Sequence, residues 1–342
     1  MNWGFIVNRV INRFATLLLL MVFSFFVFEI IPQSLGFNLG FFFTGITQLQ
    51  PHAAQGQLDL INAAIRKYGL KDPLPERIAV YLYDLFTLNF GNSAVFKEPV
   101  ITVIEQYLPN SLLLGTVSIV TTSVLAIVFG IISARSFISS KHKVGDSVLS
   151  GISIITFNVP LIVLALVLYV IFADQLHWFP INLADATTGL GAATYTGVDY
   201  YLRYLWAAFL PILALTLVGF GGGTVLVRNN IIEEYNSAGY ITHARARGLP
   251  ENRIFYRHAL RNAILPFITG VGIGVAFIVG GLFFTETLFQ FPGIGYASVL
   301  SAVAFDIPFL IASTFIFGVY TLVVLFVLDF VYAFLDPRIR LG

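Results

Sequence analysis

The sequence of 342 residues contains no cysteine and few charged residues. Without cysteine, the chain can form no disulfide, no thiolate nucleophile and no cysteine-ligated zinc site. Charged residues make up 11% of the chain, whereas soluble domains average about 25%, so the chain lacks the polar coat that keeps a globule dispersed in water. The net charge of +1 argues against nucleic-acid binding, which needs a basic surplus.

Motifs that carry chemistry are missing as well. A phosphate-binding loop needs Gly-Lys-Ser/Thr, because the lysine and backbone N–H groups neutralise the phosphates, and no lysine in this chain follows a glycine. The histidines do not occur at metal-ligand spacing, and none lies in a long apolar stretch where it could act as a base. We therefore expect a protein that is not an enzyme and that binds no metal or cofactor itself.

Apolar sequence, by contrast, is abundant, at 57% of the residues. About 20 consecutive apolar residues are enough to cross a bilayer as a helix. The qualifying stretches contain only Glu29, Glu286 and Asp329 as charged residues, each near an end, and we interpret them as interfacial or capped groups rather than a proton relay. The sequence therefore predicts an all-α membrane protein with six transmembrane helices. The predicted spans are Phe14–Ile31, Ser111–Ala134, Ser147–Ala173, Tyr204–Val227, Ile264–Thr287 and Phe309–Leu335.

The basic residues predict the orientation of these spans. Of the 19 Lys and Arg residues, 13 fall on the side that holds both termini and six on the other. Because Lys and Arg accumulate in cytoplasmic loops, both termini are expected to be cytoplasmic. The first span is expected to be a retained anchor, because its apolar run is longer than that of a signal peptide and no small-residue cleavage site follows it.

Three regions are predicted along the chain. Residues 1–31 form the cytoplasmic N-terminus and the first span. Residues 32–110 have ordinary soluble composition and form a small extracytoplasmic domain, in which Leu58–Tyr68 and Glu76–Phe86 have helical apolar spacing. Residues 111–342 form a core of five spans with a cytoplasmic loop at 228–263.

The loop at 228–263 is basic and has helical patterning. Asn229–Arg247 is predicted to be a helix that Gly248 ends, and Pro250 is predicted to open a second helix. Alanines in this segment offer a small-residue surface close to several arginines. A long helical loop in a protein of otherwise short loops indicates a docking surface; the simpler alternative is a solvated loop that serves only the topology.

The segment Tyr240–Leu249 resembles the cytoplasmic loop of ABC importer permeases of the oligopeptide/dipeptide permease B type. The pattern of that family is Glu-Ala-Ala, three residues, Gly, nine residues, then Ile-x-Leu-Pro. Gly248 and Leu260 occupy the glycine and leucine positions, whereas Thr242 replaces Glu and Arg261 replaces Pro, as in the peptide-type branch. Further matching segments, in the same order as in the family, are Tyr68–Pro75, Asn89–Ser93, Leu108–Ser111, Arg257–Ala263, Leu265–Pro266, Phe291–Gly295 and Leu335–Arg340.

This resemblance implies the type I ABC importer permease fold in a prokaryotic inner or plasma membrane. It also implies four partners: a second homologous permease, two ATP-binding subunits that carry the ATP and Mg, and an extracytoplasmic substrate-binding protein. Di- or oligopeptides would be the solute, with oligosaccharides or nickel complexes as alternatives. The residues expected to contact the ATPase are Gly239, Tyr240, Thr242, Ala244, Arg245, Ala246, Arg247, Gly248 and Leu249.

The solute path is predicted at Asn158 and Pro160, which interrupt the third span and would leave backbone and amide groups available in the bilayer. A kinked helix with a satisfied Asn158 is an equally good interpretation. A stand-alone secondary transporter is the alternative from another class of protein. Such transporters usually have inverted repeats and charges at the bilayer midplane, and neither is evident in this sequence.

Overall fold

A computed structural model describes residues 3–44, 54–139, 143–188, 195–237 and 239–335 of the chain. Within these residues the secondary structure is helical and contains no β-strand; Asn92 and Pro99 form an isolated bridge. The all-α fold expected from the sequence is therefore confirmed. The helices group into two compact units. Unit 1 comprises Met1–Ser111, Val279–Phe283 and Pro292–Gly342, and unit 2 comprises Leu112–Ile278 and Phe284–Phe291.

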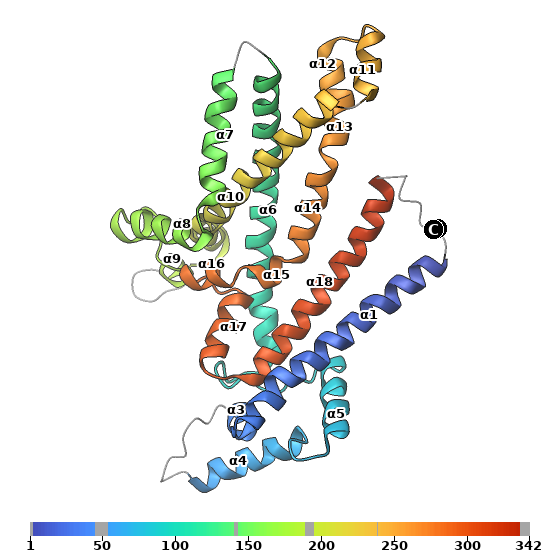
Figure 1. Ribbon diagram of the computed structural model, residues 1–342. Coiled ribbons are helices and arrows are strands. Elements are labelled where there is room, and N and C mark those ends of the chain that lie inside the picture. The colour runs from blue at the N-terminus through green and yellow to red at the C-terminus, as the bar shows by residue number, and fades with distance from the viewer. Residues whose placement is uncertain (1–2, 45–53, 140–142, 189–194, 238, 336–342) are drawn as a thin grey trace. The chain divides into compact units, whose positions relative to one another are not determined.

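Unit 1 is built around its first and last long helices (Figure 1). Helix α1 (Trp3–Phe25) continues through the π-helical η1 (Phe26–Ile30) into α2 (Ile31–Ser34), and it packs along α18 (Ile307–Leu335). The two helices are antiparallel. Gly318 lies against Leu20 near the middle of α18, and the guanidinium of Arg13 donates to Asp329 at 3.2 Å nearer its C-terminal end. The start of α1 and the end of α18 therefore lie at the same end of unit 1, as two cytoplasmic termini require.

The segment between the first two spans also belongs to unit 1. It contains α3 (Leu39–Thr44), α4 (Ala54–Lys67) and α5 (Leu74–Phe86), so both helices predicted in this region are present. Gly69 at φ +58° follows α4, and Pro73 precedes α5 with Pro75 in its first turn. Proline is tolerated there because the first N–H groups of a helix have no internal acceptor. The remaining helices of unit 1 are α15 (Ile278–Gly281), which begins in unit 2, and α17 (Ile294–Val303).

Unit 2 contains the central spans. Helix α6 (Val100–Ile138) enters from unit 1 and is followed by α7 (Lys143–Asn158), α8 (Leu161–Leu168) and the π-helical η2 (Tyr169–Gln175). The 41-residue α10 (Gly197–Ser237) packs against α7 and α8. The other helices of unit 2 are α9 (Leu183–Thr187), α11 (Gly239–Ala246), α12 (Glu251–Arg253), η3 (Ile254–Ala259), α13 (Leu260–Ala263), α14 (Leu265–Ala276) and α16 (Phe283–Leu288).

The described residues include five helices long and apolar enough to span a membrane, and a sixth span if the bent pair α7 and α8 counts as one. That pair corresponds to the span predicted over Ser147–Ala173, and the interruption expected at Asn158 and Pro160 is a bend of 98° between Asn158 and Leu161. The span expected over Ile264–Thr287 is corrected. Its helix runs from Glu251 to Ala276 and then breaks into the short helices α15 and α16.

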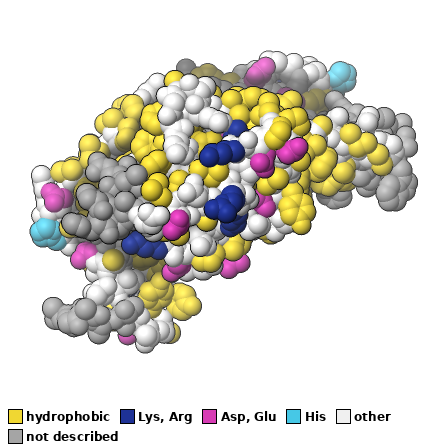
Figure 2. Space-filling view, turned by 90° about the horizontal axis from the view of Figure 1, so that it is seen from below, with side chains coloured by type: hydrophobic (Ala, Val, Ile, Leu, Met, Phe, Trp, Pro, Cys, Tyr) yellow, Lys and Arg dark blue, Asp and Glu magenta, His cyan; other side chains and the backbone are white. Residues whose placement is uncertain are grey.

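Charged side chains are sparse on the visible surface. On the face seen in Figure 2, basic and acidic side chains lie scattered among hydrophobic ones. Two of the three charged residues found in the predicted spans have basic partners inside unit 1. Glu29 accepts from Arg77 at 2.8 Å, and Asp329 pairs with Arg9 and Arg13. The third, Glu286, is fully buried, so the interpretation of these three residues as interfacial or capped groups stays a prediction.

Candidate functional site

The candidate site is α11 together with the turn that ends it. Gly248 has φ +73°, a conformation that costs glycine little and L-residues more. The Gly248 N–H donates to the Arg245 carbonyl at 2.9 Å and the Leu249 N–H donates to the Ala244 carbonyl at 3.3 Å. These two bonds, together with the shared hydrophobic cluster of Leu249 and Ala244, form a Schellman motif. The predicted stop at Gly248 is thus present, with a defined geometry.

Helix α11 has one buried face and one exposed face. Ile241 and Ala244 are buried in a hydrophobic cluster of unit 2 that also contains Val227 and Ile231 of α10. Leu249 packs against the same cluster and is half-buried. The core therefore supports α11 from one side. Exposed on the other side are Gly239, Tyr240, Thr242, Arg245, Ala246, Arg247 and Gly248.

Ala244 is the exception among the residues expected to contact a partner. It is only 6% exposed and packs into the core, so in this structure it does not contribute to the small-residue surface expected from the alanines. The helical period explains the difference, since Ile241 and Ala244 are three residues apart and share one face of α11. Ala246 faces out, as expected.

A polar cluster fixes α11 to the end of α10 and the start of α12. The guanidinium of Arg245 lies 3.3 Å from the Glu251 carboxylate and 4.5 Å from the centre of the Tyr235 ring. The Tyr235 hydroxyl donates to the same carboxylate. Arg245 is therefore held in place along one side of α11.

Tyr240 makes a second set of polar contacts. Its hydroxyl donates to Glu234 and accepts from the Asn262 amide at 2.9 Å. Partial burial and the nearby Glu234 carboxylate raise the pKa of Tyr240 to about 12. The phenol is therefore protonated at neutral pH, and its hydrogen bonds connect α10, α11 and α13.

A third contact set joins α6 to the helices after the turn. The Arg135 guanidinium donates to the Tyr256 hydroxyl at 2.6 Å and to the Asn252 side-chain oxygen at 2.9 Å. The sequence predicted the exposed residues of α11 but not these supporting residues. In the sequence these residues appear only as Tyr, Asn and Glu side chains in a loop rich in arginine. Their spacing along the chain does not indicate which of them contact one another.

Asn158 and Pro160, predicted to lie on a solute path, both sit at the bend between α7 and α8 and are exposed. The Asn158 side-chain amide donates to the Ile154 carbonyl at 2.7 Å. The amide is therefore satisfied within its own helix, as the interpretation of a kinked helix anticipates. The solute path stays a prediction. Among the residues that the structure describes, no group of three or more His, Asp or Glu side chains is placed to hold a metal ion.

The described residues thus form an α-helical protein with five candidate membrane spans, or six with the bent pair, and an exposed, core-supported helix between two of them. Residues 126–341 match the family model described as "Binding-protein-dependent transport system inner membrane component". The chain belongs to this family, which makes it a multi-pass inner-membrane protein with the type I importer permease fold.

Similar proteins cover nearly the whole chain. The dipeptide transport system permease protein DppB of Lactococcus lactis subsp. cremoris is 31% identical over 98% of this chain and 99% of its own length. The oligopeptide transport system permease protein AppB of Bacillus subtilis is 34% identical over 81% of this chain and 84% of its own length. The oligopeptide transport system permease protein OppB of Escherichia coli (strain K12) is 30% identical over 98% of this chain and 99% of its own length.

Proposed function

We propose that this chain is one of two permease subunits of an ATP-driven importer and that α11 is its contact with an ATPase subunit. The observation that carries the proposal is the exposed face of α11, held against the core by Ile241 and terminated by Gly248. The expected partners are a second homologous permease, two ATP-binding subunits and an extracytoplasmic binding protein. ATP and Mg would be bound by the ATPase subunits, because this sequence has no phosphate-binding loop.

Transport would follow from movement of α11. Closure of the ATPase subunits around ATP would displace the helix, and the hydrophobic cluster beneath it would carry the displacement into α6 and α10. Such transmission needs a packed element that moves as one body. The contacts of Arg245 with Glu251 and of Tyr240 with Asn262 supply that stiffness around α11.

Di- or oligopeptides are the proposed solute. The support comes from the names of the relatives described above, which are dipeptide and oligopeptide permeases. YejB of Agrobacterium fabrum, 31% identical over 91% of this chain, is named for peptidoglycan transport and is a partial alternative. Oligosaccharides and nickel complexes are the alternatives for the same machinery. A stand-alone secondary transporter is the alternative from another class.

The decisive experiment is purification and reconstitution of the complex. We expect two ATPase subunits and a second permease to co-purify with this chain. We also expect uptake by the reconstituted complex to require the binding protein and to be inhibited by vanadate. Competition among a dipeptide, a tetrapeptide, a trisaccharide and a nickel chelate identifies the solute. Uptake driven by an ion gradient through this chain alone, without ATP, would overturn the proposal.

A further inference from the structure

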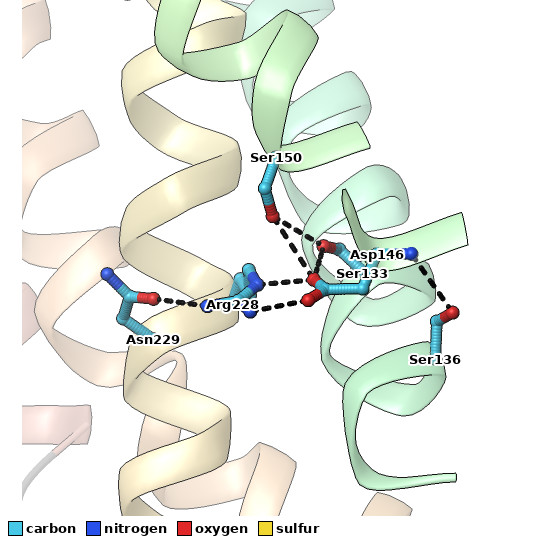
Figure 3. A network of polar contacts seen from close by, with 6 residues as sticks. All are labelled: Ser133, Ser136, Asp146, Ser150, Arg228 and Asn229. Carbon is cyan, nitrogen blue, oxygen red and sulfur yellow. Dashed lines mark hydrogen bonds and ion pairs between the residues drawn. The ribbon is translucent and has the colours of Figure 1, made fainter. Parts of the chain in front are cut away.

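A buried ion pair joins three helices of unit 2 below the candidate site. The Arg228 guanidinium on α10 contacts both carboxylate oxygens of Asp146 in the first turn of α7, from Nε at 2.5 Å and from Nη2 at 2.7 Å. Ser133 of α6 and Ser150 of α7 donate to the same carboxylate at 2.6 and 3.1 Å. Figure 3 shows these side chains converging, with Ser136 and Asn229 at the edges. We call the six residues of Figure 3 the Asp146 network.

The carboxylate at the centre of the network is shielded from solvent, whereas Arg228 is half-buried and Asn229 is exposed. Asp146 is 7% exposed, and the Arg228 guanidinium lies 4.9 Å from the centre of the Phe137 ring. A bidentate pair with further hydrogen bonds is the arrangement in which a buried charge is compensated. Removing one partner would leave the other charge buried and unpaired, so the two residues are expected to function as a unit.

Helix α10 also packs closely against α6 and α7 at glycine residues. A β-carbon added to Gly130 of α6 would lie 2.7 Å from the Val227 side chain of α10. One added to Gly221 of α10 would lie 2.8 Å from the backbone nitrogen of Phe157 in α7. The Gly221 contact lies toward the end of α7 far from Asp146, so the ion pair secures the other end of α7.

The position of the network relates it to α11. Arg228 precedes Gly239 by 11 residues, and its neighbour Val227 belongs to the hydrophobic cluster that also holds Ile241. This cluster draws on α6, α10, α11 and the helices after Gly248, yet among its described members none comes from α7. At the end of α7 nearest the 228–263 loop, the Asp146–Arg228 pair links α7 to α10, and hydrogen bonds of Asp146 with Ser133 and Ser136 link it to α6.

We propose that Asp146 and Arg228 are positioning residues for coupling: they make α7 move with α10 when α11 is displaced. This inference rests on the proposed role of α11 and extends it to a span that the hydrophobic cluster does not reach. Without the pair, α11 could still bind the ATPase and ATP could still be hydrolysed. The bent pair α7 and α8 would then follow α10 less completely, and less solute would be imported per ATP hydrolysed.

The test compares variants in the reconstituted complex. Asp146→Leu combined with Arg228→Met removes the pair without leaving a buried charge, so the complex is expected to assemble. The number of ATP molecules hydrolysed per solute imported should rise by roughly 2- to 30-fold, the range of coupling changes measured along such networks. The charge swap of Asp146→Arg with Arg228→Asp should bring this ratio back toward the wild-type value.

The matched control is the other buried pair, Glu29 and Arg77 of unit 1. Replacing it by Glu29→Leu with Arg77→Met should leave the ratio of ATP hydrolysed to solute imported unchanged in the assembled complex. A wild-type ratio in the apolar Asp146/Arg228 double variant would overturn the inference, since a purely structural pair predicts that result.

A distance measurement tests the same inference without transport. The chain has no cysteine, so spin labels can be placed specifically at Val144→Cys on α7 and Glu233→Cys on α10, both of which are exposed. The inference predicts a narrow inter-label distance distribution that broadens in Asp146→Asn. An unchanged distribution contradicts it. If the wild-type complex binds no ATPase, the proposed function fails, whereas this measurement still reports on the network.

Discussion

At the scale of single residues, Gly248 determines how α11 ends. No atom lies within 4 Å of a β-carbon added there, so a larger side chain would clash with nothing. Any loss of stability on substitution would therefore come from the backbone conformation alone. At φ +73° the backbone of an L-residue is about 1–2 kcal/mol higher in energy than in its usual conformation. Asn tolerates this conformation better than β-branched residues do.

We therefore expect Gly248→Val to loosen the turn and to raise ATP hydrolysis per solute imported, while Gly248→Asn stays close to wild type. Both variants add bulk at the same place, so the comparison isolates backbone conformation. ATPase and uptake assays on the two reconstituted complexes measure the effect. If the Gly248→Val and Gly248→Asn variants hydrolyse the same number of ATP molecules per solute imported, the turn at Gly248 is not required for coupling.

The buried Arg77–Glu29 pair in unit 1 gives a prediction on stability. Both side chains are about one-twentieth exposed, and Arg77 also donates to Gln33 at 2.7 Å. Because removal of one partner strands the other charge, Arg77→Met should destabilise the protein by about 3–5 kcal/mol, and the added Glu29→Leu should recover most of that loss. Thermal unfolding in detergent measures both variants. A double variant no more stable than the single one would contradict this account.

At the scale of helices, one glycine on α10 and one on α7 distinguish the effect of close packing from that of helix propensity. Gly221 faces the backbone of α7, whereas Gly151 on α7 has no atom within 4 Å of an added β-carbon. Gly221→Ala should therefore destabilise by about 1–3 kcal/mol through overpacking. Gly151→Ala should be neutral or stabilise by up to about 1 kcal/mol, because alanine is the better helix former. Unfolding midpoints that move in the same direction for both variants would refute this assignment.

The helices also show what the sequence could and could not predict. Hydropathy identified every long apolar helix, since burial in lipid demands such runs whatever the tertiary structure. The break after Ala276 was missed, because the apolar composition continues through α15 and α16 while the helix does not. The 98° bend was anticipated only as a kink, because Pro160 disfavours helical geometry at the preceding residue without fixing an angle.

In the candidate site, the sequence predicted the helix ends, which depend on neighbouring residues, but not the contacts between helices, which depend on tertiary packing. Gly248 and Pro250 affect the backbone only within about one helical turn. The end of one helix and the start of the next were therefore predictable from these residues. The partners of Arg245 and Tyr240 depend on how α10, α11 and α13 pack, and no spacing rule supplies that. Ala244, expected on the small-residue surface, is buried in the core, because alanine fits both a core and a close contact surface and its residue type does not tell the two apart.

At the scale of the whole molecule, the distribution of charge predicts the topology. Arg13 of α1 contacts Asp329 of α18, so these two helix ends share a side, and the excess of basic residues assigns that side to the cytoplasm. The same rule places α11 inside and α4 outside. Single cysteines in this cysteine-free chain can test both placements independently of any partner.

We expect Asp59→Cys on α4 to react with a membrane-impermeant maleimide in intact cells, and Thr242→Cys on α11 to react only after permeabilisation. Both positions are exposed on helices, and the cells express this chain without ATPase subunits, so a difference in labelling reports sidedness rather than burial by the protein or by a partner. Full labelling of each cysteine after permeabilisation is the control. Labelling of Thr242→Cys in intact cells would invert the topology and place α11 out of reach of any cytoplasmic ATPase, which would remove the physical basis of coupling through this helix.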